Sequence, residues 1–113
     1  MVCDAGDVVI VPFPFTDGPQ TKRRPALVIS PSDFNRASGH AIMAMITAAD
    51  RSAWPGDVPL DRAASDRLGL TKPCIIRMKF FTIDNRLIIK AVALMPPPEC
   101  QQVRVFLDRL LRI

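Results

Sequence analysis

With 113 residues, the chain is predicted to form one domain over residues 1–113, because it is too short for two cores. An apolar content of 49% and a mean hydropathy of +0.18 favour a homodimer that covers exposed apolar surface. The net charge of +4 and the excess of arginine over lysine favour a nucleic-acid partner over the alternative, in which the positive charge only aids solubility. The unpaired spacing of the cysteines and the absence of a long apolar run argue against a disulfide framework, a metal, a signal peptide and a membrane span. We therefore expect a cytoplasmic protein without metal or cofactor, with packing roles for Cys3, Cys74 and Cys100.

The first half of the chain predicts three strands. Asp7–Phe15 is rich in β-branched residues, and its prolines place its far end at a sheet edge or in a loop. Thr16–Arg24 is polar and ends in three basic residues, which predicts a flexible loop. Pro25–Ser30 and Ala41–Thr47 are apolar runs of strand length, separated by a turn over Pro31–Gly39 with at most one helical turn.

The second half begins with a looser pattern. Asp57–Leu60 is a candidate short strand, and Arg62–Leu68 is a candidate brief helix that ends at a glycine. Two longer strands follow, at Cys74–Ile83 and Leu87–Leu94. Their spacing across Asp84–Arg86 predicts a hairpin.

The C-terminus predicts a helix. The proline run at 96–98 stops the sheet, and a proline in the first helical position costs no hydrogen bond. Five or six short strands and this helix predict a mostly β fold, a small partial barrel of antiparallel strands. No phosphate-binding glycine motif is present. One apolar stripe on the helix is formed by Val103, Phe106, Leu107, Leu110 and Leu111.

Few residues offer ordinary catalytic chemistry. His40 stands alone at the start of an apolar strand, where a histidine is usually structural, and Glu99 is interpreted as a favourable charge in the first helical turn. Arg24 and Thr47 remain, one entering a buried strand and one leaving another. Composition alone slightly favours the alternative, in which Arg24 is a solvated loop charge and Thr47 a β-former.

A series of short segments spans the chain from about Gly6 to the C-terminal helix. The specific part is an Arg-Pro pair before a buried strand, followed at a distance by Ile-Thr. The whole series resembles the PemK/MazF family of type II toxin–antitoxin mRNA interferases. The segments are Gly6–Val9, Arg24–Ser30, Phe34–Asn35, Ile46–Thr47, Gly69–Pro73, Ile76–Arg77 and Thr82–Asp84.

The resemblance implies an SH3-like, CcdB/PemK-like partial barrel that works as a homodimer. It implies a toxin that is a metal-independent, sequence-specific endoribonuclease and cleaves single-stranded mRNA by 2′-hydroxyl attack. It also implies a cognate MazE/PemI-like antitoxin whose acidic tail covers the RNA groove. The family's catalytic arginine before proline corresponds to Arg24 and its threonine at a strand end to Thr47, and an arginine that some members use in the later strand corresponds to Arg77. Because arginine hardly deprotonates, we assign Arg24 to electrostatic stabilisation and leave the general base unassigned.

Two departures from the family pattern add positive charge. Several relatives carry an acid or a histidine where this chain has residues 20–23, and some carry an aspartate where this chain has Lys79. These changes leave RNA binding better supported than catalysis. The residues expected to contact RNA are Gln20, Lys22, Arg23, Arg51, Lys72 and Lys79.

Base recognition requires stacking surfaces, and the chain has no tyrosine. Phe13, Phe15 and Trp54 are candidates, with core packing as the alternative for the two phenylalanines. The cleaved RNA sequence is not predicted. Two other functions stay open for this fold, a gyrase-poisoning toxin that leaves RNA intact and a non-catalytic RNA-binding regulatory module.

Overall fold

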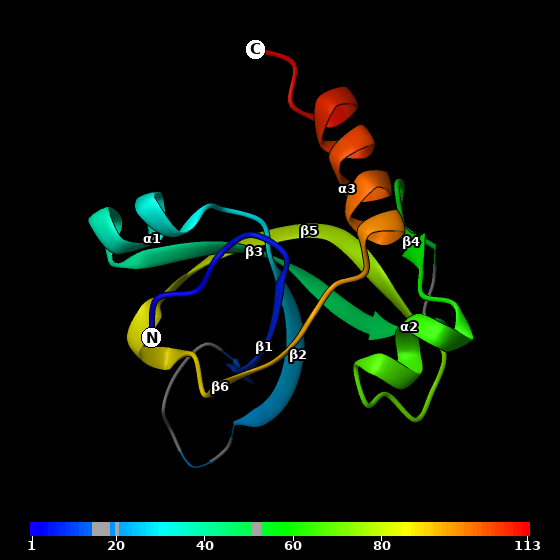
Figure 1. Cartoon of the computed structure of the whole chain (residues 1–113), viewed down its shortest axis with the longest axis horizontal. Coiled ribbons are helices and arrows are strands. Elements are labelled where there is room, and N and C mark those ends of the chain that lie inside the picture. Colours follow the sequence, from blue (N-terminus) through cyan, green and yellow to red (C-terminus); the bar gives the residue numbers. More distant parts are fainter. Residues whose placement is uncertain (15–18, 20, 51–52) are drawn as a thin grey trace.

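The structure is a computed structural model that describes residues 1–14, 19, 21–50 and 53–113. The described residues form six strands, three α-helices and one 3₁₀ helix (Figure 1). In chain order these are β1 (Asp7–Phe13), β2 (Lys22–Val28), α1 (Ser32–Ser38), β3 (His40–Ala48), β4 (Val58–Pro59), α2 (Arg62–Arg67), β5 (Cys74–Asp84), η1 (Asn85–Leu87), β6 (Lys90–Leu94) and α3 (Pro97–Leu110).

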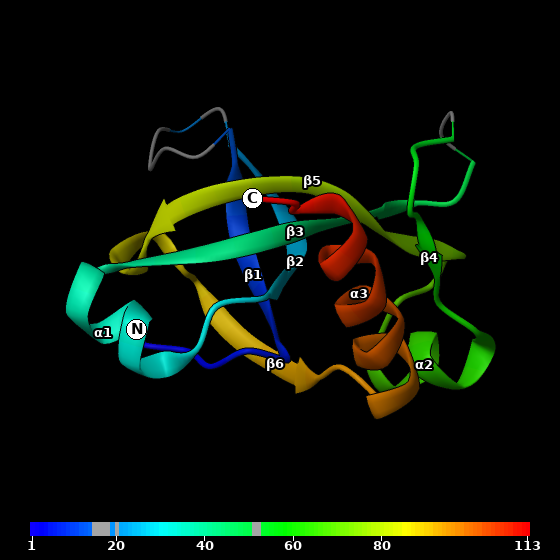
Figure 2. The same ribbon diagram turned by 90° about the horizontal axis from the view of Figure 1, so that it is seen from above.

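The strands form one antiparallel sheet in the order β4-β5-β3-β2-β1-β6. The sheet curls strongly, so that β1 crosses β3 and β5 at a steep angle (Figure 2). Helix α3 packs beside β4, while α1 and α2 lie at opposite ends of β3 (Figures 1 and 2). The predicted mostly β fold, a partial barrel of antiparallel strands with a C-terminal helix, is confirmed.

Both faces of the sheet bury apolar side chains. Leu27 and Ile46 belong to a first cluster, which also holds Val103 of α3. Val28 and Met43, which pair across β2 and β3, belong to a second cluster on the other face. Because neighbouring residues in a strand point to opposite faces, strands buried on both sides read as continuous apolar runs.

The basic triplet at 22–24 belongs to β2, so the flexible loop predicted for Thr16–Arg24 is wrong over these residues. The triplet pairs residue by residue with Val11–Phe13 of β1. Charged residues carry little local strand signal, and the pairing with β1 decides their conformation. Strand β6 pairs only with Asp7–Ile10. The β6-facing edge of β1 is therefore unpaired at Pro12, where no N–H donor is available.

The segment Pro31–Gly39 holds a seven-residue helix, longer than the single turn predicted. The helix ends at Gly39, whose φ of 74° lies in the left-handed region that favours glycine. Its buried Asn35 donates hydrogen bonds to the carbonyl oxygens of nearby Ser30 and of Cys3 in the N-terminal segment, and its backbone oxygen accepts from the Asn85 side chain. Such long-range bonds favour helix where the local pattern predicts a turn.

The predicted hairpin between β5 and β6 is also wrong. Strand β5 pairs with β3 and β4, and β6 pairs with β1. The 3₁₀ helix redirects the chain between them, and its Asn85 side chain donates to the backbone oxygen of Asn35 at 2.7 Å. The backbone N–H of Ile89 then donates to the oxygen of Ile10 at 2.9 Å. Strand β6 thus pairs with the edge of β1 over Asp7–Ile10.

Helix α3 buries only part of its apolar stripe. It begins at Pro97, in agreement with the tolerance of the first turn for proline. Val103 is buried, whereas Leu110 is 49% and Leu111 is 63% exposed. The last turn of the stripe therefore stays uncovered in the single chain. Among the described residues, no helix has the length and apolar character needed to cross a bilayer.

The three cysteines are free thiols. Cys3 is buried, and Cys74 and Cys100 are half-buried. Burial raises the pKa of each thiol above its ordinary value. Because the thiolate is the reactive form, these cysteines are poor nucleophiles, which agrees with the predicted packing role.

Asp84 caps the 3₁₀ helix and gives the fold a pH-dependent contact. The Arg86 guanidinium, and then the Arg86 backbone N–H, donate to its carboxylate and hold the pKa of Asp84 well below its usual range. Since the unfolded value is about 3.9, this carboxylate stabilises the fold above about pH 4 and ceases to do so as the pH falls. Asp84→Ala is expected to lower Tm at neutral pH, with the difference from wild type shrinking in acid. Thermal unfolding followed by circular dichroism checks this, and a difference that grows in acid would contradict it.

Candidate functional site

A cavity of about 430 Å³ lies where β1, β2, β3 and β5 come together. At this place the strands carry polar and charged residues beside their apolar ones. We call this cavity the Arg24 pocket. Its walls are formed by Phe13, Arg24, Met45, Ile46, Thr47, Arg77 and Lys79.

Strand register explains why Arg24 and Thr47 share this pocket. In the ladder between β2 and β3, Ala26 pairs with Met45. Continued by two residues along each strand, the same register sets Arg24 opposite Thr47 on the same face of the sheet. Arg24 also pairs with Val11 of β1. Its backbone is therefore held in a strand, although its side chain carries a charge.

An irregularity in β5 adds Lys79 to the pocket wall. Between the partners of Ala44 and Met45, β5 carries two extra residues relative to β3. An insertion of two residues keeps the alternation of side chains in phase. Arg77 and Lys79 therefore both face the pocket, while Met78 between them enters the first cluster.

Arg77 is paired with a carboxylate from the segment before β4. Its Nε donates to Oδ1 of Asp57 at 3.1 Å, and its Nη2 donates to Oδ2 at 3.0 Å. The two side chains are only 10% and 19% exposed. Hydrogen bonding to Asp57 raises the pKa of Arg77 above its ordinary value, despite the opposing effect of burial. Arg77 is thus a fixed, permanently charged donor.

Trp54 contacts Lys79, one of the residues that line the pocket. The Lys79 Nζ lies 4.7 Å from the centre of the indole ring, which is a cation–π distance. The backbone N–H of Trp54 donates to Oδ2 of Asp57 at 3.0 Å. The segment Trp54–Asp57 is therefore joined to the pocket through both Lys79 and Arg77.

Sequence reasoning missed Asp57 as a site residue, because it was interpreted only as the start of a short strand. A signal was present. Arg77 lies inside the apolar run predicted as Cys74–Ile83, and an arginine buried in a strand needs an anionic partner. The sequence does not show which of its eleven acidic residues supplies that partner.

The pocket gathers cationic and neutral hydrogen-bond donors around one opening. Arg24, Arg77 and Lys79 bring three positive charges, and Thr47 brings a hydroxyl. Asp57 offsets one of these charges. The remaining balance suits an anion, and planar guanidinium groups suit the oxygens of a phosphate.

Comparison with known proteins is consistent with this geometry. A model of the PemK-like, MazF-like toxins of type II toxin–antitoxin systems matches residues 4–111. The chain belongs to this toxin family. No curated protein sequence gives a match.

Solved structures of MazF proteins resemble this PemK/MazF-like toxin over nearly its whole length. A MazE–MazF crystal structure (Form-III) from Deinococcus radiodurans is 28% identical, with a TM-score of 0.75 over 97% of this chain and 96% of that chain. MazF of the same organism (Form-I) is also 28% identical, with a TM-score of 0.74 and the same coverage. A mycobacterial endoribonuclease in complex with its cognate antitoxin has a TM-score of 0.68 at 13% identity, over 96% of this chain and 91% of that chain. At that identity the likeness shows the fold alone.

The predicted RNA-contacting residues of this PemK/MazF-like chain are not all gathered in one place. Lys79 lines the Arg24 pocket, and Lys22 is exposed on β2, paired with Phe13. Arg23 points to the other face and lines a separate cavity with Arg86. Lys72 lines a third cavity beside α2. Predictions on Phe15, Gln20 and Arg51 lie outside the described residues.

The residues set aside as non-catalytic lie away from the Arg24 pocket. His40 is exposed, with Nδ1 3.1 Å from the backbone oxygen of Ser38. Glu99 is in the first turn of α3 as predicted, but it is buried, and its Oε2 has no hydrogen-bond partner among the residues that the structure describes. In the described part of the chain, no cluster of three His, Cys, Asp or Glu side chains could hold a metal.

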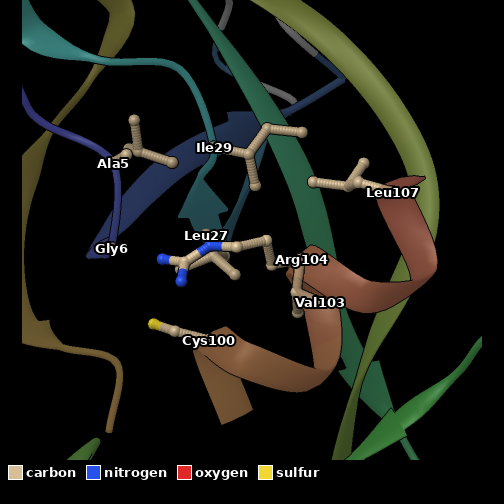
Figure 3. A pocket seen from close by; sticks show the side chains of 9 residues that line it. Ala5, Gly6, Leu27, Ile29, Cys100, Val103, Arg104 and Leu107 are labelled. Carbon is tan, nitrogen blue, oxygen red and sulfur yellow. The ribbon is translucent and has the colours of Figure 1, made fainter. Parts of the chain in front are cut away.

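A further cavity, of about 280 Å³, lies between α3 and the strand end near Gly6 (Figure 3). Arg104 reaches across it, and the Cys100 thiol points toward it (Figure 3). The Cys100 Sγ donates to the backbone oxygen of Met95 at 3.5 Å. In contrast to the Arg24 pocket, its described side chains are mainly apolar, with Leu27, Ile29, Val103 and Leu107 among them.

Proposed function

We propose that this toxin is a sequence-specific endoribonuclease that cleaves single-stranded mRNA in the cytoplasm by 2′-hydroxyl attack, without a metal. The observation that supports the proposal is that Arg24 and Thr47, far apart in sequence, line the same pocket with Arg77 and Lys79. A phosphodiester in this pocket would meet guanidinium, ammonium and hydroxyl donors together. These are the groups that stabilise a phosphate as it gains negative charge.

Each residue has a distinct role in the proposed reaction. The 2′-hydroxyl loses its proton and its oxygen attacks the adjacent phosphorus, the bond to the 5′-oxygen of the next nucleotide breaks and that oxygen takes up a proton, which leaves a 2′,3′-cyclic phosphate and a 5′-hydroxyl. Arg24 offsets the negative charge that builds on the non-bridging oxygens. Thr47 donates a hydrogen bond that holds the phosphate in line for attack. Arg77 supplies a second fixed guanidinium. The general base stays unassigned, because arginine hardly deprotonates.

The substrate is proposed to extend beyond the pocket along exposed donors and rings. Lys22 is exposed at the start of β2, next to Phe13, which is 43% exposed and lines the pocket. Trp54, 40% exposed, contacts Lys79, which also lines the pocket. Unstacked bases bind to such aromatic surfaces, whereas paired bases are not available to them. These features favour single-stranded RNA.

Two protein partners belong to the proposal. We propose a homodimer, because large apolar side chains remain exposed on the single chain, with Leu94 at 70% and Leu111 at 63%. We also propose a MazE/PemI-like antitoxin with an acidic segment, because the Arg24 pocket carries an excess of positive charge. The Deinococcus structure described as MazE–MazF is consistent with an antitoxin partner.

The decisive experiment incubates the purified toxin with a long RNA in excess EDTA and maps the ends. We expect cuts that leave a cyclic phosphate and that a single 2′-deoxy substitution at the cut site abolishes. Thr47→Val keeps the shape of the side chain and removes the hydroxyl, so it is expected to slow cleavage about tenfold or more, while Thr47→Ser retains activity.

Other outcomes of this experiment point to the other functions of the fold. Intact RNA that binds with steep salt dependence indicates a non-catalytic RNA-binding module. Intact RNA together with trapped DNA gyrase complexes indicates a gyrase poison. Cleavage that EDTA abolishes contradicts the metal-independent reaction.

A further inference from the structure

Asp57 has a role at the Arg24 pocket that goes beyond neutralising a charge. We infer that Asp57 is a positioning residue, whose carboxylate sets the plane of the Arg77 guanidinium so that it faces the bound phosphate. This inference rests on the proposed ribonuclease function and concerns the same site.

The contact between the two side chains is bidentate. Nε and Nη2 of Arg77 donate to different oxygens of Asp57, at 3.1 and 3.0 Å. Two parallel hydrogen bonds fix a planar guanidinium in both position and rotation, which a single bond does not do. Arg77 lines the pocket, so the orientation that Asp57 favours affects how the guanidinium is presented there.

Asp57 is itself held in place from two directions. Its Oδ2 accepts the backbone N–H of Trp54 at 3.0 Å, and its own backbone N–H donates to the Trp54 oxygen at 3.2 Å. The next residue, Val58, pairs with Ile76 in the sheet. Asp57 is therefore anchored next to β4, which pairs with β5 beside Arg77. Its carboxylate does not move with a free loop. A support of this kind is what a preorganised site requires.

The geometry favours positioning over direct catalysis by Asp57. Its two oxygens already accept three hydrogen bonds, two from Arg77 and one from Trp54. Both oxygens are therefore already engaged by groups of the fold itself. Asp57 also does not line the pocket, whereas Arg77 does.

A purely electrostatic role predicts the opposite result to a positioning role. Asp57 is a negative charge next to a pocket that is proposed to bind phosphate. By charge alone, its removal would strengthen RNA binding and speed the reaction. If Asp57 positions Arg77, its removal slows the chemical step without weakening binding. Separate measurements of kcat and KM for the variant therefore distinguish the two roles.

The test uses Asp57→Asn, which keeps the size of the side chain. It replaces one of the two oxygens that accept from Arg77 with an NH₂ group, which is a donor. We expect kcat to fall about tenfold, the scale of coupling between contacting residues, with KM unchanged or lower. Asp108→Asn removes the same charge from an exposed position on α3 and is expected to leave kcat unchanged. A rise in kcat for Asp57→Asn, or an equal fall for Asp108→Asn, overturns the inference.

A double-mutant cycle shows whether Asp57 acts through Arg77. In an Arg77→Ala background, Asp57→Asn is expected to cause no further loss of kcat, and additive losses overturn the inference. Thermal unfolding verifies that each variant folds. If Asp57→Asn does not fold, Asp57→Glu, which keeps the charge but displaces it, takes its place in the cycle with the same expectation.

The failure of this inference can be separated from failure of the proposed function. If the wild-type protein leaves RNA intact, the proposed function fails, and the cycle is measured as binding of the same single-stranded RNA at low salt. The positioning role is supported if Arg77→Ala weakens RNA binding by a different factor in the Asp57→Asn background than in the wild-type background. Equal contributions of Arg77 in both backgrounds overturn it.

Discussion

Arg24→Ala is expected to slow RNA cleavage by about 10²–10³-fold, the usual loss when one preorganised donor to a developing oxyanion is removed. Arg24 lines the pocket together with Thr47, and its backbone is fixed by pairing with Val11. Its charge is not matched by any ion pair among the described residues. Its guanidinium lines the pocket in which a phosphate is proposed to bind. The measurement is the single-turnover rate on a defined RNA in EDTA.

Arg23→Ala is a matched control for this experiment. The two arginines are neighbours in β2, but strand alternation sends them to opposite faces, and Arg23 lines a different cavity. We expect Arg23→Ala to weaken RNA binding by a few-fold at most and to leave the single-turnover rate at saturating RNA nearly unchanged. Equal rate losses in the two variants would show that the Arg24 pocket is not the catalytic site.

Asn35→Ala is expected to destabilise the fold by about 3 kcal/mol or more, because buried polar groups lose their partners. Asn35 is fully buried. Its Oδ1 accepts the Ser30 hydroxyl, and its Nδ2 donates to the backbone oxygens of Cys3 and Ser30 at 2.9 and 3.0 Å. Alanine removes all three bonds and leaves a cavity. Against a total stability of about 5–15 kcal/mol for a small domain, this is a large fraction.

Urea unfolding measures this loss, with Arg36→Ala as the control on the same helix. Arg36 is exposed, and its replacement is expected to change the free energy of unfolding by no more than about 0.5 kcal/mol. Asn35→Asp keeps the shape but replaces two donors with a charge facing two carbonyl oxygens, so it is also expected to destabilise the fold strongly at neutral pH. A small effect of both Asn35 variants would contradict the structural role of this residue.

Local sequence pattern predicted those elements whose own residues favour one conformation. The apolar runs predicted at Pro25–Ser30 and Ala41–Thr47 lie mainly in β2, which ends at Val28, and in β3, because their side chains are buried on both faces. The C-terminal helix begins at Pro97, where the proline run predicts it. In these segments the local preference and the tertiary packing agree.

Prediction failed where contacts between distant residues decide the conformation. Lys22–Arg24 is a strand only because β1 pairs with it. Strand β6 follows β5 closely in sequence but joins β1, because the 3₁₀ helix and the Asn85 side chain redirect the chain. The residues of these two segments do not show which strand they pair with, because strand pairing depends on both segments together.

Some residues of the candidate site were likewise predicted from the sequence, and others were not. The family pattern named Arg24, Thr47 and Arg77 one by one, and the fold brings all three into one pocket. Their catalytic roles remain predictions. Asp57 lies twenty residues before Arg77 and has no local signature. Residues 20 and 51, also predicted to contact RNA, lie outside the described residues.

The amino-acid sequence by itself determined the β-rich class, the C-terminal helix and the family to which the chain belongs. These follow from local residue preferences and from short motifs that can be recognised in order. Only the tertiary structure decided which strands pair, which face each arginine occupies and which carboxylate holds Arg77. Those features depend on register and on long-range hydrogen bonds, whose free energy exists only when distant segments meet.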